Sequence, residues 1–98
     1  MTLTPEALSE IENALKERVG KDAYRIGFFV ACCAKKIGEL PVAQVQPFTA
    51  AFVKLVADWA NVRPWKNPFR DPYKDMRNRT RLFAQHWKLD EDFIKAMG

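Results

Sequence analysis

Hydrophobic residues recur at spacings of three and four through most of this 98-residue chain, which is the period of an amphipathic α-helix. The first apolar stripe consists of Leu8, Ile11, Leu15 and Val19. Thr4 and Pro5 precede it as an N-cap and a first helical residue, and Gly20 follows it as a C-terminal stop. We therefore predict a first helix from about residue 5 to residue 19.

A second helix is predicted from about Asp22, as its N-cap, to Ile37, with Gly38 ending it. Between Ile26 and Ala34 this segment is apolar on nearly every face. Such a helix either occupies the centre of a bundle or forms part of an interface.

A third helix is predicted from about Pro47 to Asn61, after a connector bracketed by Pro41 and Pro47. Its buried face is marked by Phe48, Phe52, Leu55, Val56 and Trp59. The polar residues Lys54 and Asp58 are expected on its outer side.

A proline-rich loop is predicted over about residues 62–72, between the third and fourth helices, because Pro64, Pro68 and Pro72 recur within it. Trp65 and Phe69 make this loop too apolar for an unattached linker, so we expect it to pack across the bundle. A fourth helix then runs to about Lys88, with an inward stripe of Tyr73, Met76, Thr80, Phe83 and Trp87.

A short terminal helix is predicted within residues 89–98, with Asp90 as its N-cap and a hydrophobic staple between Leu89 and Ile94. Together these elements predict an all-α fold: a compact single-domain bundle of four to five helices over residues 1–98. The predicted core contains Leu8, Ile11, Leu15, Phe28, Phe29, Val30, Phe48, Phe52, Leu55, Trp59, Phe83 and Trp87.

Composition fits a folded domain, with 48% hydrophobic and 29% charged residues. The longest apolar run is far too short to span a bilayer, so we expect no membrane partner. Adjacent Cys32 and Cys33 lie in an apolar run, where cysteine acts as a small hydrophobe. With no recognisable secretory signal at the start, these features favour a reducing, cytoplasmic location.

Positive charge is concentrated in residues 63–88, which hold eight of the 16 Lys and Arg residues against two carboxylates. Residues 1–62 balance seven basic residues with seven acidic ones. Like charges this dense favour a polyanionic partner. The candidate site residues are Arg63, Trp65, Lys66 and Arg70 of the loop and Lys74, Arg77, Arg81 and Lys88 of the fourth helix.

On the fourth helix, the basic residues of the site form a row beside the inward stripe, and Arg77 and Arg81 have no acidic residue at a matching spacing on this helix. Asp75, by contrast, is placed to pair with Arg79 four residues later. The first hypothesis is therefore a small non-enzymatic accessory or regulatory protein whose basic row meets nucleic-acid phosphates, DNA or RNA. An exposed Trp65 or Phe69 would add stacking on unpaired bases.

Two further hypotheses use other partners. The same arginine and aromatic residues suit an adaptor or inhibitor that docks on an acidic protein. A homodimer through residues 28–34 is the third. A helix-turn-helix is disfavoured: Ala84, Lys88 and Ile94 have its spacing, but Lys88 replaces the turn glycine and the second helix would start with acidic residues. With one histidine and no metal or nucleophile motif, we expect no catalytic residues, metal or cofactor.

Overall fold

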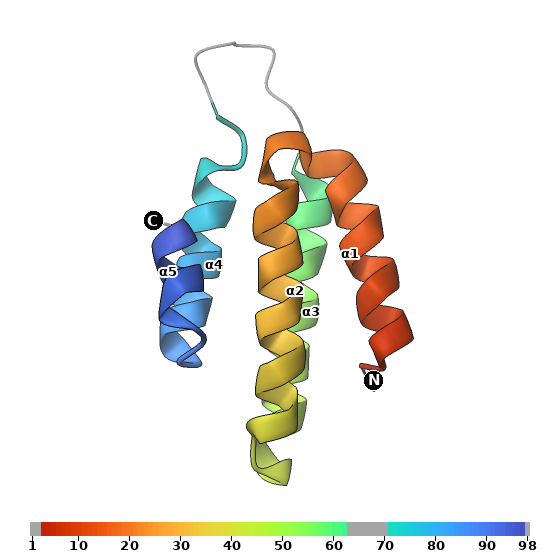
Figure 1. Ribbon diagram of the computed structural model, residues 1–98, viewed down its shortest axis with the longest axis vertical. Helices are drawn as coiled ribbons and strands as arrows, with labels where there is room; N and C mark the ends of the chain where they lie inside the picture. The colour runs from red at the N-terminus through yellow and green to blue at the C-terminus, as the bar shows by residue number, and fades with distance from the viewer. Residues whose placement is uncertain (1–2, 63–70, 98) are drawn as a thin grey trace.

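The computed structural model describes residues 3–62 and 71–97, and every regular element in those ranges is helical (Figure 1). The elements are α1 (Pro5–Val19), a 3-10 turn η1 (Gly20–Asp22), α2 (Ala23–Glu39), α3 (Val42–Asn61), α4 (Lys74–His86) and α5 (Glu91–Met97). The predicted all-α fold is confirmed. Most of the predicted proline-rich loop, at residues 63–70, lies outside the described residues.

The helices pack side by side, with α2 and α3 between α1 on one side and the α4–α5 pair on the other (Figure 1). α5 runs back alongside α4, so the two helices form a hairpin (Figure 1). A helix-turn-helix would instead cross its second helix at a steep angle and leave it free to enter a groove. Phe93 and Met97 of α5 are buried in the core, which argues further against that arrangement.

The core is built around aromatic rings contributed by four helices. The ring centroid of Phe29, on α2, lies 5.4 Å from that of Phe52 on α3, 5.7 Å from that of Phe83 on α4 and 5.8 Å from that of Phe93 on α5. This central position explains why α2 is apolar on nearly every face. Ring contacts at such distances add to the free energy gained from burial alone.

Most of the predicted core is confirmed. Its buried members are Leu8, Leu15, Phe29, Val30, Phe48, Phe52, Leu55 and Trp59. The other four, Ile11, Phe28, Phe83 and Trp87, are partly buried and pack against them. The sequence prediction overlooked Phe93 and Met97, because a seven-residue helix shows too few turns for its apolar period to stand out.

The start of α1 was predicted correctly, since Thr4 Oγ1 accepts a hydrogen bond of 3.1 Å from the backbone N–H of Ala7. Gly20 ends that helix with a φ of 54°, a left-handed conformation that glycine adopts without strain. Two other predicted boundaries were wrong. α2 continues through Gly38 to Glu39, and α3 begins at Val42, so Pro47 lies inside the helix.

Pro47 is tolerated because it lies near the helix start and on the exposed side of α3. Its ring removes one backbone donor, and the buried Phe48 and Phe52 that follow hold the helix against the core.

Among the described residues, no helix combines the length and hydropathy needed to cross a membrane.

The two cysteines are unpaired, with Cys33 buried and Cys32 partly buried, as their apolar surroundings predicted. Burial raises the pKa of the Cys33 thiol, and burial together with the nearby negative charge of Asp90 raises that of Cys32. Both groups are therefore thiols near neutral pH, a state in which cysteine is a poor nucleophile.

Candidate polyanion-binding surface

The structure describes half of the predicted site. Lys74, Arg77 and Arg81 lie on α4, and Lys88 lies in the turn that follows it. The loop members Arg63, Trp65, Lys66 and Arg70 lie outside the described residues. The basic row therefore has to be judged from its helical part.

Arg77 does not face solvent as a free cation, which corrects the prediction that it lacks an acidic partner. Its Nη1 lies 3.2 Å from Oδ2 of Asp22, and its Nη2 donates to the carboxylate of Asp71. Asp22 is buried, with a side chain only 5% exposed. The helical spacing rule missed this pairing because both carboxylates come from outside α4.

Asp22 pairs with both Arg77 and Arg25, and these contacts join the start of α2 to the C-terminal helices. Arg25 Nη1 lies 2.5 Å from Asp22 Oδ1, and Arg25 Nε donates to the carbonyl of Ala96 at 2.9 Å. Asp22 does occupy the predicted N-cap position of α2, but its carboxylate makes no capping hydrogen bond. It is committed to the two guanidinium groups, which a buried carboxylate requires.

The pKa values of the exposed end of this network follow from the same contacts. Hydrogen bonding from Arg77 lowers the pKa of Asp71, and hydrogen bonding to Asp71 raises the pKa of Arg77. Asp71 also accepts a hydrogen bond of 2.9 Å from the backbone N–H of Tyr73, just before α4 begins. Asp71 therefore orders the entry to α4 as well as neutralising Arg77.

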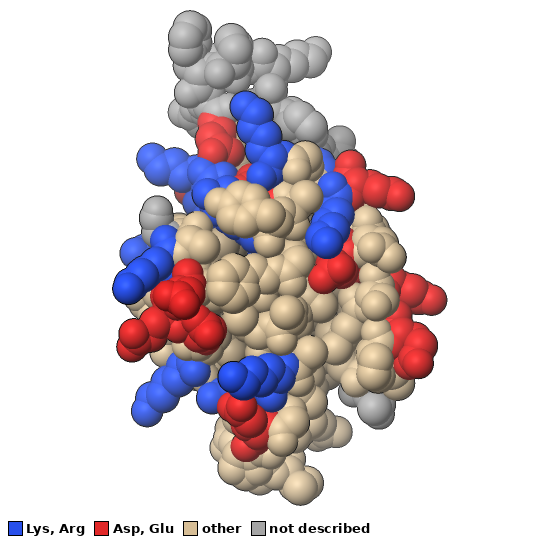
Figure 2. Space-filling model, viewed as in Figure 1, with Lys and Arg blue, Asp and Glu red and all other residues tan. Residues whose placement is uncertain are grey.

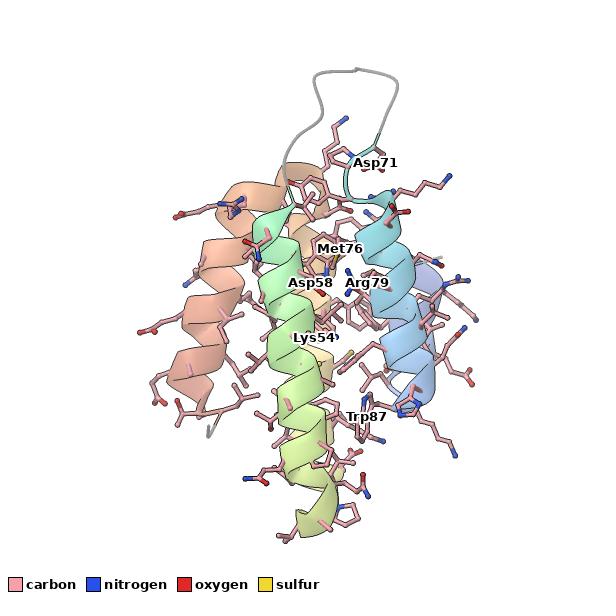
Figure 3. The ribbon with its side chains drawn as sticks, turned by 180° about the vertical axis from the view of Figure 1, so that it is seen from behind. Lys54, Asp58, Asp71, Met76, Arg79 and Trp87 are labelled. Carbon is pink, nitrogen blue, oxygen red and sulfur yellow. The ribbon has the colours of Figure 1, made fainter. Side chains whose placement is uncertain are left out.

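Arg79 is also paired, but with a different residue from the one predicted. Its Nη2 contacts the carboxylate of Asp58 on α3, and the two side chains point toward one another between the helices (Figure 3). Asp75, the predicted partner four residues earlier, is exposed and makes no ion pair with another described residue. The pair therefore links α3 to α4 instead of stabilising α4 alone.

Lys74 and Arg81 are the members of the row that keep an available positive charge on this part of α4. Neither has a carboxylate within ion-pair distance among residues 3–62 and 71–97. Arg81 Nη2 contacts the neutral side chain of Asn78, and its Nε is buried without a hydrogen-bond partner. Both side chains line a cleft of about 370 Å³, together with Asp75, Arg77, Asn78 and Met97.

A second cleft, of about 530 Å³, adjoins the first through Arg77. It is lined by Val19, Lys21, Asp22, Arg25, Asp71, Pro72, Tyr73 and Arg77. The two clefts together present five cations and three carboxylates, so their surplus of positive charge is smaller than the sequence suggested. Figure 2 shows Lys and Arg gathered at this end of the molecule, beside the grey residues, with Asp and Glu among them.

Lys88 is separated from the other candidates. It lines a different pocket, of about 340 Å³, with Lys35 and Lys36 of α2 and with Glu39 and Asp90. Its backbone has a φ of 55°, so the turn between α4 and α5 uses a left-handed residue where glycine is favoured. The predicted row is thus divided between two places on the surface.

Comparison of the chain with protein-family models, with curated proteins and with solved structures found no match.

Proposed function

We propose that this chain is a small non-enzymatic protein that contacts the phosphate backbone of a nucleic acid through Lys74 and Arg81. The observation that carries the proposal is that these two cations line one cleft and have no carboxylate partner among the described residues. They are seven residues apart on α4, two helical turns, so they lie about 10 Å apart along one face. Cations in such a row make phosphate contacts that are independent of sequence.

Arg77 has a supporting part in this proposal. Because Asp22 and Asp71 occupy its guanidinium group, it contributes little net charge to the surface. It fixes the position of α4 against η1 and so holds Lys74 and Arg81 in place. Lys21, which lines the adjoining cleft, extends the proposed contact beyond α4.

The test is the double substitution Lys74→Glu with Arg81→Glu, measured by heparin retention and by fluorescence anisotropy on single- and double-stranded probes. We expect retention to fall sharply and the salt dependence of duplex binding to weaken by about 1.8 in log–log slope, roughly 0.9 for each lost phosphate contact. Helicity by circular dichroism is expected to stay unchanged, because neither side chain forms an ion pair with a described carboxylate.

The matched control is Lys35→Glu with Lys95→Glu, which changes the net charge equally at exposed positions outside the two clefts. Equal losses in both double variants would show a response to net charge alone and would contradict a localised contact. Undiminished binding by the Lys74 and Arg81 variant would remove the proposal.

A second candidate is an adaptor or inhibitor that binds an acidic protein. The observation that favours it is Leu82, which follows Arg81 on α4 and is 52% exposed. An exposed apolar side chain beside an arginine suits a protein partner better than a phosphate chain. Pull-down with and without nuclease separates the two candidates, and Leu82→Ser would weaken only the protein complex.

The free thiols of Cys32 and Cys33 support a reducing compartment such as the cytoplasm for this activity.

A further inference from the structure

Tyr24 places an aromatic ring on the surface near the start of α2. It is 59% exposed, and it is the one exposed ring among the Phe, Tyr and Trp side chains that the structure describes. The other described tyrosine, Tyr73, is partly buried: its ring stacks on Trp59, and its hydroxyl donates to the carbonyl of Arg18 at 3.1 Å. Tyr24 has no comparable part in the packing of the described residues, so its ring is available to another molecule.

One face of the Tyr24 ring is covered by Arg25. The guanidinium carbon of Arg25 lies 4.7 Å from the ring centroid, a cation–π contact. Arg25 is itself held in place, because its Nη1 contacts Oδ1 of Asp22 and its Nε donates to the carbonyl of Ala96. The exposure of Tyr24 leaves the opposite face of the ring to solvent. A ring that is already oriented in this way loses less conformational freedom when a ligand stacks on it.

Tyr24 also adjoins the positively charged clefts. Lys21 and Arg25 line the cleft of about 530 Å³. Lys21 precedes Tyr24 by three residues, a spacing that brings two side chains to the same side of a helical turn. Asp22 connects Arg25 to Arg77, whose side chain lines both clefts. In Figure 1, α2 and α4 begin at the same end of the molecule, which is where these residues meet.

We propose that Tyr24 stacks on an unpaired base, so that the nucleic acid bound by this chain is a single strand. This inference rests on the proposed phosphate contact of Lys74 and Arg81, and it adds the class of nucleic acid. Proteins hold single strands with cations that follow the phosphates and with aromatic rings that stack on the bases. In a duplex the bases are already stacked on one another, so a surface ring has no free base to contact.

The charge around the ring favours a nucleic acid over an apolar partner. Lys21, Lys74 and Arg81 line the two clefts, and none of them has a carboxylate within ion-pair distance among residues 3–62 and 71–97. An apolar surface laid against Tyr24 would remove water from nearby cations without supplying a negative charge. A stacked base carries its own phosphates, which can approach the same cations.

Fluorescence anisotropy with two labelled single strands of about 12 nucleotides tests the proposal. One is an oligothymidine, and the other has the same backbone with a stable abasic analogue at every position, so the two differ only in their bases. The wild-type chain should prefer the intact strand. Tyr24→Ala should weaken binding to the intact strand by roughly 5- to 100-fold and leave binding to the abasic strand unchanged.

The matched control is Tyr24→Phe, which keeps the ring and should retain the preference for the intact strand. Helicity by circular dichroism should be unchanged in both variants, because Tyr24 is exposed. Binding to a duplex of the same length should also be unchanged by Tyr24→Ala, since the duplex uses the cations and not the ring.

Three results would count against the proposal, and they are distinguishable. Equal binding of the two strands by the wild-type chain, or a preference that Tyr24→Ala does not reduce, would overturn stacking and leave the phosphate contact standing. An equal loss of binding to the intact strand, the abasic strand and the duplex in Tyr24→Ala would show that Tyr24 does not act through a base. Failure of the wild-type chain to bind any probe would instead remove the proposed function, and the stacking with it.

Discussion

The indole N–H of Trp59 donates a hydrogen bond of 2.9 Å to Oγ1 of Thr80, across the interface between α3 and α4. The same hydroxyl donates to the backbone carbonyl of Met76 at 2.7 Å. Trp59 is the largest residue in the core, and both it and Thr80 are fully buried. The Thr80 hydroxyl therefore supplies the hydrogen-bond acceptor that the buried indole N–H needs. The pairing also fixes the rotation of α4 and hence the direction in which Lys74 and Arg81 point.

Thr80→Val should destabilise the fold by about 1–3 kcal/mol, because it keeps the side-chain shape but leaves the Trp59 N–H buried without an acceptor. Urea denaturation measures the change. In a Trp59→Phe background the donor is already gone, so the valine substitution should cost less there. Equal costs in both backgrounds would mean that the hydrogen bond contributes nothing.

Arg77→Ala should cost about 1–3 kcal/mol, because it removes one of the two guanidinium partners of the buried Asp22 while Arg25 remains. Arg79→Ala is the matched control: it breaks an ion pair whose side chains are 49% and 31% exposed, worth about 0–1 kcal/mol. Thermal unfolding compares the two. If the two substitutions lower the free energy of unfolding by the same amount, the ion pairs of Asp22 do not stabilise the packing of α4.

Stability should fall as the solution becomes acidic, in part through Asp71. Hydrogen bonding from Arg77 lowers the pKa of Asp71 in the folded state, so its contribution is present above the usual aspartate pKa of about 3.9. The contribution is lost as the pH falls through the lower pKa of the folded state. The effect is modest, because the group is largely exposed to solvent.

The measurement is the free energy of unfolding at pH 7 and at pH 3, for the wild-type chain and for Asp71→Asn. The variant should be less stable at pH 7 and should lose less stability on acidification. If the free energy of unfolding differs between the wild-type chain and Asp71→Asn by the same amount at pH 7 and at pH 3, the Asp71 charge does not act through Arg77.

The helices could be predicted because their signals are local. Thr4, Pro5 and Gly20 delimit α1 within one turn of its ends, and the apolar stripes identify the faces that meet in the core. Pro47 misled the prediction, because a proline early in a helix removes a single hydrogen bond and does not need to end it.

The ion pairs that join α4 to η1 and to α3 could not be predicted, because their partners are distant in sequence. Asp22 and Arg77 are 55 residues apart, and Asp58 and Arg79 are 21 apart. The i, i+4 spacing rule applies only to partners within the same helix, so it predicted Asp75 as the partner of Arg79 and no partner for Arg77. The number of cations on α4 that lack a carboxylate partner was therefore overestimated from the sequence.

Lys88→Gly should stabilise the protein by about 0.5–1 kcal/mol. Lys88 adopts a φ of 55°, and Leu89 donates to the carbonyl of Ala84 at 2.9 Å, the hydrogen bond that closes a left-handed helix end. A side chain strains this conformation, and glycine removes the strain at some cost in the entropy of the unfolded chain.

Lys88→Ala is the control, since it removes the same charge but keeps the Cβ atom, so it should leave the free energy of unfolding nearly unchanged. Chemical denaturation of the three chains distinguishes the backbone effect from the charge effect. Because Lys88 lies in a different pocket from Lys74 and Arg81, both variants should retain most of the binding to a nucleic-acid probe. A loss of binding as large as that caused by Lys74→Glu with Arg81→Glu would show that the basic row acts as one surface despite its division in the fold.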